Sequence, residues 1–183
     1  MRVNSVKITK AVESLLWSNY DLKSKKPVGG LALAGMGNDK VWYSNTALGD
    51  GYLYKLLLEE EKFSKLFGFL YENSDNICLI PWMQHKGKYL DQGITDFINT
   101  HMMGRFPGVI IEKPTAQIGK RFFVVEYYAL QDLRMYEQPI ETINVKDMDT
   151  SADDSIKRLM NFWIDECKEE KGRMIKVPDT YLQ

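Results

Sequence analysis

The chain has 183 residues, of which 44% are hydrophobic and 27% are charged, and its formal net charge is −1. This length suits one domain whose core needs no disulfide or metal support, and the composition excludes a disordered chain, which combines few apolar residues with a large net charge. The near-zero charge also disfavours a sequence-independent nucleic-acid binder, which depends on many uncompensated Lys and Arg side chains. We therefore expect a single globular domain over residues 1–183.

The two cysteines, Cys78 and Cys167, are predicted to be reduced core thiols, because secreted scaffolds of modest size use more cysteines. Cys78 lies in an apolar run at 77–80, and Cys167 lies on the apolar stripe of a predicted helix. The first residues lack the apolar segment of a signal peptide, and no run approaches the length of a transmembrane helix. These features predict a cytoplasmic protein with no membrane partner.

The first predicted elements are a helix and a hairpin. Apolar side chains at near-helical spacing predict a helix over 5–18, with Ser5 as its cap. Two β-prone runs, 30–36 and 40–45, flank turn residues and predict a hairpin. Small and turn residues then predict a loop over 45–51.

A second helix is predicted over 52–71, where leucines and phenylalanines recur at helical spacing. A turn at 73–76 follows, and then a short buried strand at 77–80 that Pro81 is expected to end. A third helix is predicted over 91–103.

The C-terminal half is predicted to contain strands at 108–112 and 121–130, joined as a hairpin, and a weaker edge strand at 139–146. The last helix begins at Thr150 or Ser151 as its cap, and its apolar stripe is the clearest in the chain. That stripe consists of Ile156, Leu159, Met160, Trp163, Ile164 and Cys167. A final strand is predicted over 173–177.

Hairpins dominate this order of elements. We therefore expect an α+β fold, with a mainly antiparallel sheet built from hairpins and three to four helices packed on it.

Four glycines, Gly29, Gly30, Gly35 and Gly37, form the most suggestive local cluster. A glycine-rich loop can bring backbone N–H groups to a phosphate, but the spacing is not that of a dinucleotide fingerprint and no G-K-[ST] follows. The glycines lie within and at the tip of the predicted hairpin, where a role in turns and close packing is favoured. Contact with a phosphate in the segment 29–37 stays open.

His85 is the first choice for a general acid or base, because it lies in a loop that follows a predicted strand. Asp91 and Glu112 are the accompanying carboxylates of such a site, which would be assembled from distant segments. The other histidine, His101, shares the apolar face of its predicted helix and is expected to be a packed core residue.

No metal site or cofactor is expected. Asp91 and Asp96 lie five residues apart on a predicted helix, so they point about 140° away from each other and cannot share one ion. Neither a H-E-x-x-H motif nor a Cys/His zinc pattern occurs.

The favoured function is binding of another protein, because the chain shows no local catalytic motif and contains 10 Tyr and 4 Trp. Tyr and Trp are enriched at interface hot spots. The protein is expected to be an inhibitor, an immunity-type neutraliser or a subunit of an assembly. The expected contact residues are Trp82, His85, Tyr127, Tyr128 and Tyr136.

Two alternatives remain. One is an enzyme with a site assembled around His85. The other, which is less favoured, is a nucleic-acid-binding accessory protein that would use the lysines at 23–26 and 86–88.

Overall fold

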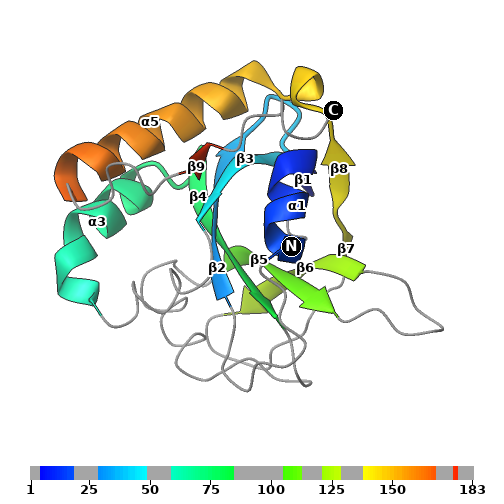
Figure 1. The fold of residues 1–183 in the computed structure, drawn as a ribbon. Helices are drawn as coiled ribbons and strands as arrows, with labels where there is room; N and C mark the ends of the chain where they lie inside the picture. The colour runs from blue at the N-terminus through cyan, green and yellow to red at the C-terminus, as the bar shows by residue number, and fades with distance from the viewer. Residues whose placement is uncertain are drawn as a thin grey trace.

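The computed structural model describes residues 5–18, 29–48, 59–84, 105–112, 121–128, 138–167 and 175–176, which form an α+β fold (Figure 1). The strands of its one mixed sheet are β1 (Val6–Thr9), β2 (Gly29–Met36), β3 (Trp42–Leu48), β4 (Ile77–Gln84), β5 (Arg105–Glu112), β6 (Arg121–Tyr128), β7 (Gln138–Pro139), β8 (Glu141–Ile143) and β9 (Ile175–Lys176). The helices are α1 (Lys10–Ser18), α3 (Ser64–Glu72) and α5 (Thr150–Cys167), with 3-10 turns η1 (Glu60–Phe63) and η2 (Val145–Asp147).

The sheet is mixed, so the expectation of a mainly antiparallel sheet is wrong. Its strand order is β7-β6-β5-β4-β2-β3-β1-β8, and β9 pairs with β3 off this path. The two predicted hairpins, β2–β3 and β5–β6, are antiparallel as expected. However, β1 runs parallel to both β3 and β8, and β4 runs parallel to β5. Parallel neighbours need long connections between them, and local turn signals do not predict such pairings.

The two ends of this sheet are neighbours in the chain. β7 ends at Pro139 and β8 begins at Glu141, although they are the first and last strands of the path. The sheet therefore curls until its ends lie on either side of Ile140, and Figure 1 shows the strands curving round in this way. The edge strand predicted over 139–146 is confirmed only at β8, because Pro139 belongs to β7 at the opposite end of the sheet and η2 follows from Val145.

The first element also differs from its prediction, because β1 precedes α1 within the segment expected to be one helix. Val6 and Ile8 are buried, whereas Lys7 between them is only half-buried, which is the alternation of a strand. Thr9, rather than Ser5, caps α1. This is because the Thr9 Oγ1 accepts a hydrogen bond of 3.4 Å from the backbone N–H of the third helical residue.

Two strands run further than the sequence predicts. β3 continues through Asn45 and Thr46 to Leu48, where a loop is expected, and both polar side chains are buried in it. β4 passes through Pro81 instead of ending before it. The pairing of β4 with β5 begins at Trp82, so only β2 is registered beside Pro81.

The remaining predictions hold in part. The helix expected over 52–71 is described from η1 onward, and its α-helical part is α3. The turn at 73–76 is confirmed, and β9 lies within the strand expected over 173–177. The helix expected over 91–103 lies outside the described residues.

Among the described residues, the largest fully buried side chains of the core are Trp163, Phe63, Ile8, Leu31, Leu33, Leu48 and Leu66. The Trp163 and Phe63 rings meet edge to face with centroids 6.2 Å apart, an arrangement that stabilises aromatic pairs beyond the area they bury. The predicted stripe of α5 is confirmed at Ile156, Leu159 and Trp163, which are all buried. α5 therefore packs across β2 and β3 as the main cover of the core (Figure 1).

A seam of three side-chain pairs joins α3 to α5, which lie beside each other in Figure 1. The pairs of this α3–α5 seam are Lys65–Glu166, Phe69–Phe162 and Asn73–Arg158. The ion pair spans 3.1 Å, the stacked ring centroids lie 4.1 Å apart, and the hydrogen bond is 2.8 Å long. The members on each side are four residues apart and pair in reverse order, so the two helices run antiparallel.

Candidate functional site

The residues predicted to catalyse or bind are only partly described. Three of them lie outside the described residues: His85, Asp91 and Tyr136. Four others lie in strands whose backbone pairing is described: Trp82, Glu112, Tyr127 and Tyr128. The backbone register therefore tests which of these four come together.

The backbone register places Trp82 at a different level of the sheet from Tyr127 and Tyr128. Trp82 is registered with Val109 of β5, and Val109 is registered with Val124 of β6. Tyr127 lies three residues further along β6, which corresponds to roughly 10 Å along the strand. Trp82 and Tyr127 therefore lie on neighbouring parts of the sheet but not at one level.

Glu112 lies where β4 and β5 end together. These two strands are parallel, and Gln84, the last residue of β4, is registered with Ile111. Glu112 is the next residue and the last of β5. In the sequence, His85 is the residue that follows Gln84.

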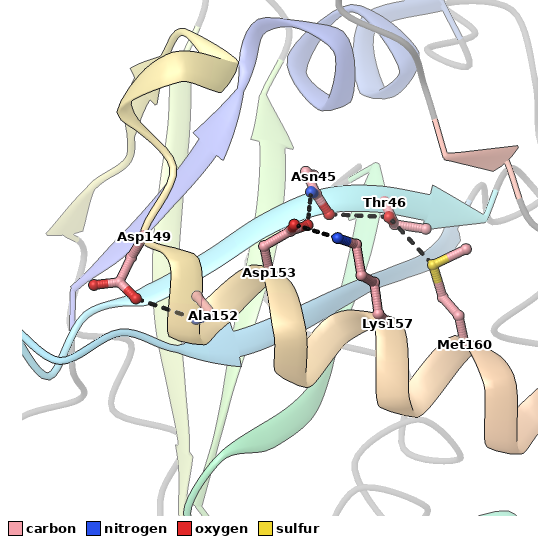
Figure 2. Close-up of polar contacts among 7 residues, drawn as sticks. All are labelled: Asn45, Thr46, Asp149, Ala152, Asp153, Lys157 and Met160. Atoms are coloured by element: carbon pink, nitrogen blue, oxygen red, sulfur yellow. Dashed lines mark hydrogen bonds and ion pairs between the residues drawn. The ribbon is translucent and has the colours of Figure 1, made fainter.

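A chain of polar side chains links β3 to α5 (Figure 2). The Asn45 amide nitrogen donates a 2.9 Å hydrogen bond to Asp153, and the Lys157 Nζ lies 3.0 Å from the other carboxylate oxygen. The Thr46 hydroxyl donates to the Asn45 Oδ1 over 3.0 Å, and it lies 3.8 Å from the Met160 Sδ. We call Thr46, Asn45, Asp153 and Lys157 the β3–α5 polar chain. It runs from a fully buried hydroxyl to a half-exposed ammonium.

A β-bulge positions Asn45. Between Ser44 and Thr46, β3 advances two residues while β2 advances one, which leaves Asn45 as the extra residue. On the other side of β3, the described pairings join β1 to residues up to Ser44 and β9 to residues from Thr46 onward. Bulges re-aim side chains, and this one turns the Asn45 amide toward Asp153.

The chemistry of the β3–α5 polar chain suits a structural link. The Asp153 side chain raises the pKa of Lys157 through its hydrogen bond and its charge, so the ammonium stays protonated. Asn45 and Thr46 are neutral and hydrogen-bonded to each other. The spacing of Asp153 and Lys157, four residues apart on a helix, is a sequence signal that could have identified this pair. No local signal connects either of them to Asn45.

A second polar group surrounds the β2–β3 turn. The Tyr43 hydroxyl donates a 2.6 Å hydrogen bond to the Asp39 carboxylate. Burial, and then this hydrogen bond, raise the pKa of Tyr43 to about 12. The same bond lowers the pKa of Asp39. The Lys7 Nζ lies 5.8 Å from the centre of the Tyr43 ring and 3.5 Å from a carboxylate oxygen of Glu141, so β1 and β8 also contribute to this group.

Asp149 joins the N-terminus of α5 to the same turn. One carboxylate oxygen accepts a hydrogen bond from the backbone N–H of Ala152, and the other accepts one from the backbone N–H of Asn38, each over 3.2 Å. The helix cap is therefore Asp149, and the prediction of Thr150 or Ser151 is off by one or two residues. Ser, Thr and Asp all serve well as caps, so the sequence alone could not choose among these neighbours.

The structural role expected for the glycine cluster is confirmed at two positions. A Cβ added to Gly35 would overlap the carbonyl oxygen of Ala152 at the start of α5. A Cβ on Gly37 would lie 2.6 Å from a carboxylate oxygen of Asp39. The segment Gly29–Gly30 opens β2 and is registered with β4. Close packing accounts for Gly35 and Gly37 without a phosphate.

Cys78 is a free, buried thiol, as expected, and burial raises its pKa well above the usual value. Cys167 ends α5, and its side chain lies outside the described residues. Within the described ranges, no three His, Cys, Asp or Glu side chains gather in a way that could hold a metal ion. None of the helices that the structure describes is both long enough and apolar enough to span a membrane.

The comparisons with known proteins give no family. The chain matches no family model and no curated protein. Among solved structures, it is similar to the solution structure of protein DSY2949 from Desulfitobacterium hafniense, with 10% sequence identity and a TM-score of 0.43. That match covers 76% of this chain and 93% of the other. A likeness at this level supports no transfer of function, so the interpretation depends on this chain's own residues.

Proposed function

We propose that this protein acts by binding another protein, as an inhibitor, an immunity-type neutraliser or a subunit of an assembly. The observation that carries the proposal is that the side chains of Asn45, Asp149 and Asp39 are used to join elements of the fold. Burial also raises the pKa values of Tyr43 and Cys78, which disfavours the loss of their protons at neutral pH.

The hydrogen bonds of the described polar side chains support the same proposal. Asn45 links a strand to a helix, Asp149 links a helix to a turn, and Asp39 fixes that turn to Tyr43. These groups hold elements of the fold together. A protein partner is typically recognised at the surface, by shape and by a few aromatic anchors.

The proposed contact surface consists of Trp82, His85, Tyr127, Tyr128 and Tyr136. Tyr127 and Tyr128 are consecutive residues of β6, so replacing each one separately tests the two positions independently.

The test is affinity purification of the tagged full-length protein from its native host, followed by mass spectrometry. Tyr127→Ser and Tyr128→Ser are compared with wild type, and Tyr71→Ser serves as a control because Tyr71 is 59% exposed on α3. We expect a stoichiometric partner that one of the two β6 variants loses while its melting temperature stays unchanged. A clean monomer from wild type contradicts the proposal, whereas a partner that every variant retains contradicts only the choice of surface.

The second candidate is an enzyme whose site includes His85 and Glu112. One observation favours it: Gln84 and Ile111 are registered neighbours in parallel strands, and His85 and Glu112 are the residues that follow them in the sequence. An imidazole and a carboxylate within hydrogen-bond reach of each other can act as a general acid–base pair, and this candidate requires that arrangement of His85 and Glu112. The enzyme candidate ranks second because its support is limited to the backbone register at the end of the β4–β5 pair.

We also propose a cytoplasmic location. The free thiol of Cys78 supports it, since the cytosol keeps thiols reduced.

A further inference from the structure

We draw no further inference here: the strongest candidate, the partly exposed α3–α5 seam around the stacked rings of Phe69 and Phe162, carries none because its side chains pair with one another within the chain and nothing in the structure shows what would cover them.

Discussion

The side-chain amide of Asn45 donates a hydrogen bond to the carboxylate of Asp153 across 108 positions of sequence. Asn45 is only 4% exposed, and its carbonyl oxygen also accepts the hydroxyl hydrogen of Thr46. One side chain at a β-bulge thus joins the longest described helix to the strand beneath it. Removal of a partner from a buried hydrogen bond leaves the remaining group desolvated and unpaired, which is why this contact is a sensitive point of the fold.

Asn45→Ala is expected to destabilise the protein by about 1–3 kcal/mol, because the fully buried Thr46 hydroxyl loses its oxygen acceptor and Asp153 loses a donor. The measurement is urea denaturation of both proteins. Lys157→Ala is the matched control, since it removes the solvent-exposed end of the same polar chain and should change the free energy of unfolding much less. Equal losses in the two variants would contradict the role given to the buried end.

Two glycines are expected to respond to alanine with opposite signs. Gly35→Ala should strongly destabilise the protein, because the added Cβ overlaps the backbone of Ala152 where α5 packs on β2. Gly68→Ala should raise stability by about 1 kcal/mol, since Gly68 lies inside α3 with nothing within 4 Å of an added Cβ. Thermal unfolding of the two variants measures both effects. A neutral Gly35→Ala would show that α5 does not approach β2 as closely as described.

The burial of Tyr43 and its hydrogen bond to Asp39 predict a loss of stability at alkaline pH. The pKa of Tyr43 rises from 10.0 to about 12 in the folded protein. The folded state therefore holds this proton more tightly than the unfolded state does. Its contribution to stability is fully present below pH 10 and is lost as the pH rises from 10 through 12.

Tyr43→Phe should remove this alkaline loss, because the variant has no phenol to ionise at that position. The free energy of unfolding, followed from neutral pH to pH 12 for both proteins, measures the effect. The difference in phenolate absorbance between the two native proteins reports the ionisation of Tyr43 directly. A native-state midpoint near 10 would contradict both the burial of the Tyr43 hydroxyl and its hydrogen bond to Asp39.

Local sequence signals predicted the elements whose contacts are local. The turn at Gly37–Asp39 specified the β2–β3 hairpin, and the spacing of Ile156, Leu159 and Trp163 specified the buried face of α5. β1 was missed because Val6 and Ile8 give too short an alternation to outweigh the helical spacing that follows.

The candidate site was less predictable than the fold, since its contacts join distant segments. Asn45 has a turn-forming side chain, and only its partner on α5 explains why it lies within a strand. The parallel pairing of β4 with β5 likewise has no signal in either strand alone. Glu112 was identified as a candidate from the sequence. Only the backbone register shows that Ile111, the residue before it, is paired with Gln84 at the end of β4.

Titration of the two histidines distinguishes the two proposed functions. In the enzyme candidate, the Glu112 carboxylate stabilises the His85 imidazolium, so Glu112→Gln should lower the titration midpoint of His85. In the protein-binding proposal, no such contact is required and the midpoint should stay the same. The chain contains only two histidines, so NMR resolves both imidazoles and His101 is an internal reference. A midpoint that falls at His85 alone would support the acid–base pair, whereas equal shifts at both histidines would indicate a general change in the fold. An unchanged His85 midpoint would contradict the acid–base pair that the enzyme candidate requires and would favour the protein-binding proposal.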